Sequence, residues 1–219
     1  MNITCKITLA AAVMASTLNA ARADAPLRNT GEVVTLFLKT MDSSNQLVAL
    51  PANAPDSTLL WGGHANTVLY APDGHQLTWG EYKNVQPRAE AKCQGDGTHV
   101  VIHVSGLIPK GTYTVWVLDF TGPFPGPNSL FENLAGVGAL GLPDGSINSF
   151  QASASGEGEI TAFMPPQVLS AIPYDLKGCL LNEAEFHLVG VYHSDGMTYG
   201  GVPGYGHHAE VQFGIQMKP

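Results

Sequence analysis

Short runs of alternating apolar and polar residues recur along the chain, and a period of two is typical of β-strands. Residues 31–39 are rich in β-branched and aromatic side chains and predict the first strand. Residues 66–70 and 75–82 flank Ala71-Pro-Asp-Gly74, where proline fixes φ and glycine accepts a turn conformation. We therefore expect a hairpin at this point.

The same pattern predicts three further hairpins. They pair residues 99–105 with 112–118, residues 149–153 with 159–163, and residues 186–193 with 209–217. Almost no stretch has the period of a helix, so we expect one all-β domain over residues 24–219, an antiparallel β-sandwich or barrel with long glycine- and proline-rich loops. Residues 121–128 contain three prolines and two glycines, and we expect them to form a surface crossover loop.

The N-terminus has the features of a secretory signal. Lys6 precedes an apolar run over residues 7–18, and Ala21-Arg-Ala23 supplies a cleavage site of small residues. We expect residues 1–23 to be a signal peptide, so that the protein is exported, either to the periplasm or as a secreted protein. No second long apolar run follows, so we expect no membrane span.

The charge balance narrows the choice of partners. The predicted signal contains Lys6 and Arg22 but no acid, so its removal changes the net charge from −8 to −10. An acidic surface repels phosphate backbones and anionic headgroups, which excludes nucleic acid as a favoured partner. A small ligand, a metal ion or an extracytoplasmic protein remains as a possible partner.

Two cysteines remain after removal of the signal. An oxidising compartment favours joining Cys93 to Cys179 in a disulfide. The bond would close a loop of about 86 residues and stabilise the fold by at most about 4–5 kcal/mol on the chain-entropy model.

Histidine is the unusual residue of this chain, with eight copies. Pairing of residues 186–193 with 209–217 would bring His193 near His207 or His208 at the open end of a glycine-rich hairpin. By strand parity, His207 shares an apolar face with Ala209, Val211, Phe213, Ile215 and Met217, whereas His208 shares a wetter face with Glu210, Gln212 and Gln216. We therefore expect His193 and His207 to converge.

This group of side chains suggests a metal site. Two imidazoles with Asp195, Met197 or His208 in reach offer nitrogen, oxygen and thioether ligands, which suit zinc or copper. The alternative is a glycine-rich loop whose histidines satisfy nearby backbone groups.

Common catalytic motifs are absent, and we predict no catalytic residue. The glycines between Gly136 and Gly141 have the spacing of a dinucleotide-binding motif, but Pro143 would stop the helix that the motif needs, so we expect a glycine-rich loop there. His99 and His103 share a strand face but lie about 13 Å apart along an extended chain, too far to share one ion.

Aromatic side chains offer a different class of function. Trp79, Tyr199 and Tyr205 are candidate platforms for a small ligand such as a sugar, because aromatic rings with a polar tip stack and hydrogen-bond. Trp116 lies within an apolar strand, and we expect it in the core.

Two segments resemble the copper,zinc superoxide dismutase family. Val104-Ser-Gly-Leu-Ile-Pro-Lys-Gly111 is similar to that family's strand and glycine-leucine turn, and Leu188-Val-Gly-Val-Tyr-His193 looks like its strand carrying a copper-ligating histidine. The resemblance implies an immunoglobulin-like or superoxide dismutase-like sandwich, with His193 as a ligand candidate.

The departures from that family concern the metal ligands. Thr112-Tyr-Thr-Val-Trp-Val117 stands where the family has paired copper-ligating histidines, and residues 133–145 offer no clear zinc ligands. The resemblance therefore does not favour dismutase activity.

Three hypotheses follow. The first is an exported β-sandwich that binds a partner or serves a structural role without catalysis. The second is a copper or zinc protein with its site at His193 and His207. The third is a carbohydrate-binding accessory domain.

Overall fold

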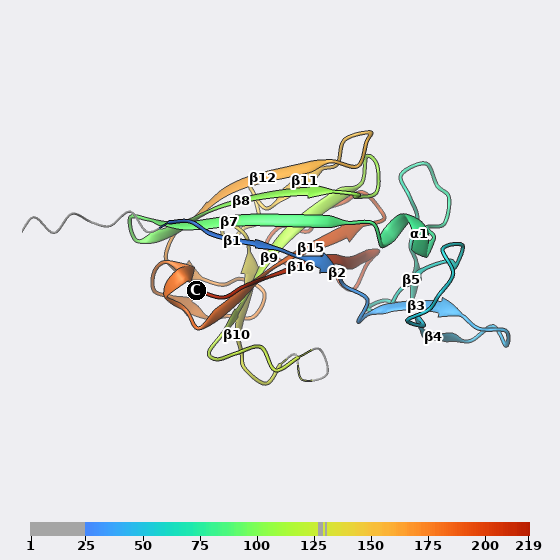
Figure 1. Cartoon of the computed structure of the whole chain (residues 1–219), viewed down its shortest axis with the longest axis horizontal. Coiled ribbons are helices and arrows are strands. Elements are labelled where there is room, and N and C mark those ends of the chain that lie inside the picture. The colour runs from blue at the N-terminus through green and yellow to red at the C-terminus, as the bar shows by residue number, and fades with distance from the viewer. Residues whose placement is uncertain (1–24, 127–128, 130) are drawn as a thin grey trace, which may run out of the picture.

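The computed structural model describes residues 25–126, 129 and 131–219 (Figure 1). The predicted signal peptide, residues 1–23, and residues 127–128 of the predicted crossover loop lie outside the described residues. No helix among the described residues is long and apolar enough to cross a membrane.

Two antiparallel sheets form the body of the protein (Figure 1). The first sheet has the order β1-β7-β8-β12, with bounds Leu27–Thr30, Gln86–Gln94, Gly97–Ser105 and Gly158–Met164. The second has the order β10-β9-β15-β16-β2, with bounds Leu134–Ala139, Thr112–Phe120, Glu185–His193, Ala209–Met217 and Glu32–Val33. A further strand of the second sheet, β11 (Ser149–Gln151), pairs with β9. The predicted antiparallel β-sandwich is confirmed.

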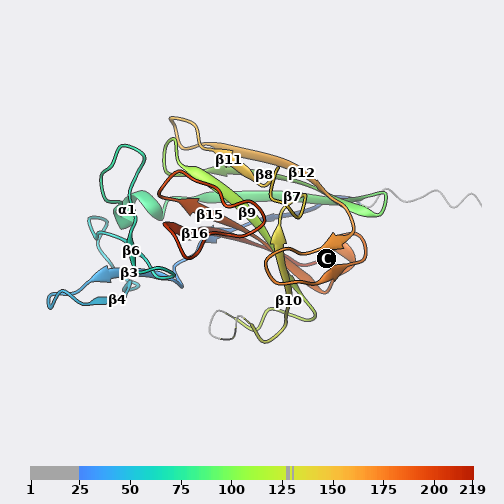
Figure 2. The same cartoon turned by 180° about the vertical axis from the view of Figure 1, so that it is seen from behind.

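Smaller elements flank this body. A small sheet with the order β4-β3-β5-β6 has bounds Leu47–Ala49, Leu38–Met41, Trp61–Gly62 and Thr67–Val68, and it is followed by the one-turn helix α1 (Trp79–Tyr82). The pair β13 (Gln167–Val168) and β14 (Asp175–Leu176) and the short 3-10 helix η2 (Leu180–Asn182) precede β15. Figure 2 shows the small sheet and α1 together at one end of the molecule.

The main core lies between the two sheets. Ile102 of β8 and Val117, Leu188 and Ile215 of the second sheet are fully buried in one hydrophobic cluster. Along β8, buried residues alternate with half-buried ones, because the outer face of the first sheet is open to solvent. Trp116 is buried as predicted, but on the opposite face of its sheet.

The predicted disulfide is confirmed. Cys93 lies near the end of β7 and Cys179 directly before η2, with 5.5 Å between their Cα atoms. The bond therefore joins the first sheet to the segment that leads into β15.

Of the four predicted hairpins, only that of residues 186–193 with 209–217 has the expected pairing throughout, as β15 with β16. The two middle hairpins are wrong, because β8 and β12 pair with each other in the first sheet while β9 and β11 pair in the second. The apolar pattern shows which face of a strand is buried, but it does not show to which of the two sheets the strand belongs. The chain instead forms a hairpin from β7 and β8, turning at Gly95 with a φ of +61°.

Two other predicted strands also differ. Residues 31–39 divide into β2 and the start of β3, because Val33 pairs with Phe213 whereas Leu38 pairs in the small sheet. Residues 75–82 form only two isolated bridges, of Gln76 with Tyr70 and of Thr78 with Leu59, and the chain then turns into α1. Glu81 starts this helix by accepting hydrogen bonds from the backbone N–H and the hydroxyl of Thr78.

The glycine motif between Gly136 and Gly141 is not the loop that we expected, because most of it forms β10. A Cβ atom at Gly136 would lie 2.3 Å from the Cβ of Tyr174, and one at Gly138 would lie 2.9 Å from Leu169. The glycines therefore allow the segment around β13 and β14 to pack closely on the strand. Residues 121–126 lack regular structure, but they leave β9 toward its direct neighbour β10 and are not a crossover.

Candidate functional site

A bulge in β16 determines which side chains meet at the predicted site. Gly190 pairs with Phe213 and Val191 with Val211, so Gln212 has no opposite residue. Phe213 therefore faces the main core, whereas Val211 joins a second apolar cluster with Trp116 on the outer face of the sheet.

The parity that we predicted for this strand is therefore wrong. Glu210 and Gln212, expected on the wetter face, are fully buried. Gln212 accepts a hydrogen bond from the hydroxyl of Tyr113 at 2.6 Å and donates one to the backbone carbonyl of Tyr82. The extra residue shifts the alternation by one position, and this change has no signature in the apolar pattern itself.

His193 lies at the end of β15, beneath the loop of residues 194–208, and only 1% of its surface is exposed. Trp116 Nε1 donates to the hydroxyl of Thr114 at 2.8 Å, and that hydroxyl lies 2.8 Å from His193 Nε2. We assign Nε2 as the acceptor for the buried hydroxyl proton, so Nδ1 carries the ring proton. Nδ1 has no partner among the residues that the structure describes, and burial lowers the pKa of His193 to about 4.

Tyr199 connects His193 to His207. Its ring lies 5.9 Å from the imidazole of His193 and stacks on that of His207 at 4.4 Å. Its hydroxyl donates to Asp195 Oδ2, which raises the pKa of Tyr199 to about 12 and keeps the phenol protonated. The two histidines that we expected to converge are thus gathered around one tyrosine ring.

The other predicted metal ligands are less well placed. Met197 is 59% exposed, and its backbone N–H donates to Asp195 Oδ1. His208 is half-buried, and its carbonyl accepts a hydrogen bond from Ser194. Within residues 25–126, 129 and 131–219, no three His, Cys, Asp or Glu side chains are grouped as metal ligands.

These contacts do not favour His193 as the metal ligand that the family resemblance suggests. His193 uses Nε2 for Thr114, and its remaining nitrogen is protonated in the tautomer assigned above. The copper or zinc site stays a prediction, which metal analysis of the purified protein would test.

A shallow hollow of about 350 Å³ lies on the loop of residues 194–208. Its lining combines aromatic and apolar side chains with two glycines, and the side chains are those of Tyr199, Val202, Pro203, Tyr205 and His207. Tyr199 and Tyr205, both predicted as ligand-binding residues, are therefore in one place. Trp79 is not with them, because it lies on α1 and packs against the main core.

Sequence reasoning missed a contact between His64 and the buried Glu210, next to Tyr205. The ring of His64 stacks on Tyr205 at 4.1 Å and lies 4.2 Å from the ring of Phe37. His64 Nδ1 lies 2.8 Å from Oε1 of Glu210, which also accepts a hydrogen bond from the backbone N–H of Val211. The two partners are 146 positions apart in sequence, and no local pattern connects them.

Close backbone contacts brace the loop from below. A Cβ atom at Gly145 would lie 2.0 Å from the carbonyl oxygen of Gly200, and one at Gly201 would lie 2.5 Å from that of Pro143. The positive φ of Gly145 and Gly200 also favours glycine. The hollow thus rests on a segment that is packed against the turn after β10.

A comparison of the chain with protein-family models finds no matching family. A search of curated proteins finds no match either.

Proposed function

We propose that this chain is an exported, non-catalytic binding protein that holds a small uncharged ligand, such as a sugar, in the hollow of the loop of residues 194–208. The observation that carries the proposal is that Tyr199, Tyr205 and His207 line one hollow. The disulfide between Cys93 and Cys179 supports an oxidising, extracytoplasmic location.

The chemistry of the lining favours binding over catalysis. Tyrosine and histidine rings stack on the apolar face of a ligand, while their polar atoms exchange hydrogen bonds with hydroxyl groups. The phenol of Tyr199 stays protonated because it donates to Asp195, so it is not a nucleophile at neutral pH. The bracing by Gly200 and Gly201 reduces the entropy lost when a ligand orders the loop.

Charge also favours an uncharged ligand for this hollow. Asp195 lies beneath Tyr199, and the net charge after removal of the predicted signal is −10. Both repel anions. A neutral sugar presents hydroxyl groups and C–H faces and is not repelled by this negative charge.

Isothermal titration calorimetry of the mature protein with a panel of neutral mono- and oligosaccharides tests the proposal. We expect Tyr199→Ala to weaken binding by about 2- to 10-fold, the range for loss of an aromatic contact, and Tyr199→Phe to retain most of it. Phe163→Ala is the matched control, because it removes an exposed aromatic ring from β12, outside the loop. Binding that is weakened equally by Phe163→Ala, or no binding across the panel, would contradict the proposal.

A further inference from the structure

The outer face of the first sheet gathers basic side chains on an acidic protein. Arg28, Arg88 and Lys92 account for three of the chain's ten lysine and arginine residues, and they lie on neighbouring strands β1 and β7. The strand register places His103 of β8 directly opposite Arg88, and His99 opposite Lys92. Glu90 and Glu159 lie on the same face, which therefore carries one more positive than negative charge with the histidines neutral, although the whole chain is acidic.

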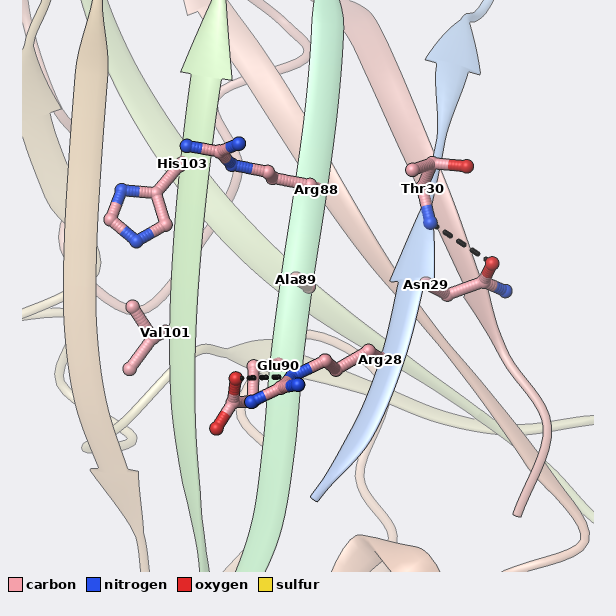
Figure 3. Close-up of a pocket in the computed structure, with 8 residues that line it drawn as sticks. All are labelled: Arg28, Asn29, Thr30, Arg88, Ala89, Glu90, Val101 and His103. Carbon is pink, nitrogen blue, oxygen red and sulfur yellow. Dashed lines mark hydrogen bonds and ion pairs between the residues drawn. The ribbon is translucent and has the colours of Figure 1, made fainter. Parts of the chain in front are cut away.

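A hollow of about 590 Å³ lies on this face, between β1, β7 and β8. Figure 3 shows the guanidinium group of Arg88 beside the ring of His103, and the ion pair of Arg28 with Glu90 farther along the same strands. Val101, a shorter and apolar side chain, lines the hollow on β8. Long basic side chains thus border a hollow with an apolar wall.

The basic side chains here are only partly paired with carboxylates. Arg28 uses Nε to donate to Glu90 at 2.7 Å, and His103 Nδ1 lies 3.1 Å from Glu159. Arg88 has no ion pair or side-chain hydrogen bond among the described residues, and its opposite neighbour is a histidine. An exposed guanidinium next to an imidazole provides a fork of N–H donors that matches the geometry of an oxyanion.

We propose that this hollow binds a small molecule bearing an oxyanion, either a carboxylate or a phosphate. Arg88 holds the oxyanion through two N–H donors, and His103, opposite Arg88 in the register, lies against it. Val101 packs against the carbon skeleton of the ligand. The site is separate from the loop of residues 194–208 and takes a ligand of opposite character, so it does not depend on the function proposed above.

Calorimetric titration at low ionic strength tests this site, with inorganic phosphate and glucuronate as probes. We expect a Kd on the order of 1 mM or tighter for at least one anion. Arg88→Gln should weaken binding of the anion by about 10- to 100-fold, the range for loss of a charge-assisted hydrogen bond. His103→Gln should weaken binding less. Lys177→Gln is the matched control, because it removes the same charge from an exposed side chain outside this face.

The two probes separate the possible sources of the oxyanion. Tighter binding of glucuronate identifies a carboxylate ligand, and tighter binding of phosphate identifies a phosphate ligand. No binding of either anion at a concentration of about ten times the expected Kd would overturn the proposal. Equal weakening of binding by Arg88→Gln and Lys177→Gln would also overturn it, because the anion would then respond only to the net charge of the protein. Equal thermal midpoints of the variants and the wild type establish that all are folded.

Discussion

His193 and Asp119 are buried ionisable residues whose surroundings oppose the charge that each would carry in water. Burial lowers the pKa of His193 to about 4. Burial and the nearby Glu183 raise the pKa of Asp119 to about 7, and neither carboxyl oxygen has a partner among the described residues. Both residues therefore make the stability of the fold depend on pH, in opposite directions.

His193 should reduce stability in acid. The unfolded chain binds a proton at this residue near its ordinary pKa of 6.5, whereas the folded chain does so only near 4. The stability that depends on neutral His193 is therefore fully present above pH 6.5. The free energy of unfolding falls by about 3 kcal/mol as the pH decreases toward 4. Denaturant unfolding between pH 7.5 and 4.5 measures it, and His193→Gln should flatten the profile. An unchanged slope in this variant would contradict the assignment.

Asp119 should reduce stability at alkaline pH. In the folded chain Asp119 keeps its proton up to about pH 7, whereas in the unfolded chain it loses the proton near pH 3.8. The stability that depends on the protonated carboxyl is therefore fully present below pH 3.8 and is lost as the pH rises toward 7. Asp119→Asn removes the buried charge and should raise the free energy of unfolding at pH 8 by up to about 4 kcal/mol more than at pH 4. Paired urea titrations at the two pH values measure this difference. An equal change in the free energy of unfolding at pH 4 and pH 8 would show that ionisation of the Asp119 carboxyl does not destabilise the fold.

At the scale of elements, the small sheet and α1 are fixed to the sandwich by contacts with β16. His64 pairs with Glu210, and the hydroxyl of Tyr82 donates to the carbonyl of Val211 at 3.0 Å. The bulge at Gln212 turns Glu210 toward these partners. The bulge thus supplies buried polar partners where regular alternation would place an apolar side chain.

Removal of the Glu210 carboxylate should loosen this attachment. Glu210→Ala leaves the His64 ring and the backbone N–H of Val211 without their partner, which costs about 1–3 kcal/mol for a buried group. We expect faster proteolytic cleavage within residues 35–82, measured by mass spectrometry of limited digests. Glu159→Ala, an exposed carboxylate on β12, is the control. Identical digestion patterns for the two variants would contradict the role of Glu210.

The strands were easier to predict than their assignment to sheets. Alternation identified β8, whose outer face is open to solvent, whereas β9, β15 and β16 were recognised as runs rich in β-branched and aromatic residues and are buried on both faces. It could not distinguish a return within one sheet from a crossing to the other, which is why β8 was wrongly paired with β9. A continuous apolar run also concealed the break between β2 and β3, since both strands are partly buried, each in a different sheet.

At the scale of the whole molecule, the disulfide holds the first sheet to the segment before β15. Replacing Cys93 and Cys179 with serine should lower the free energy of unfolding by about 2–5 kcal/mol, because the bond closes a loop of 86 residues in the unfolded chain. Denaturant unfolding of the double variant and of reduced wild-type protein measures the loss. Equal stability of the oxidised and reduced forms would contradict the stabilising role of the bond.

The binding surfaces show the same limit of sequence reasoning. Tyr199, Tyr205 and His207 lie within one loop, so their proximity could be predicted from the strands that flank it. The contact of His64 with Glu210 and the arrangement of Arg88 beside His103 depend on tertiary pairing between separate segments. No motif in the sequence marks either one.

Amide NMR of isotope-labelled protein, titrated with the neutral sugars, tests the central claim most directly. We predict chemical-shift changes concentrated in residues 194–208, with the outer face of the first sheet around Arg88 and His103 unchanged. Shifts confined to that outer face, or no shifts at millimolar sugar, would contradict a neutral-ligand site on this loop.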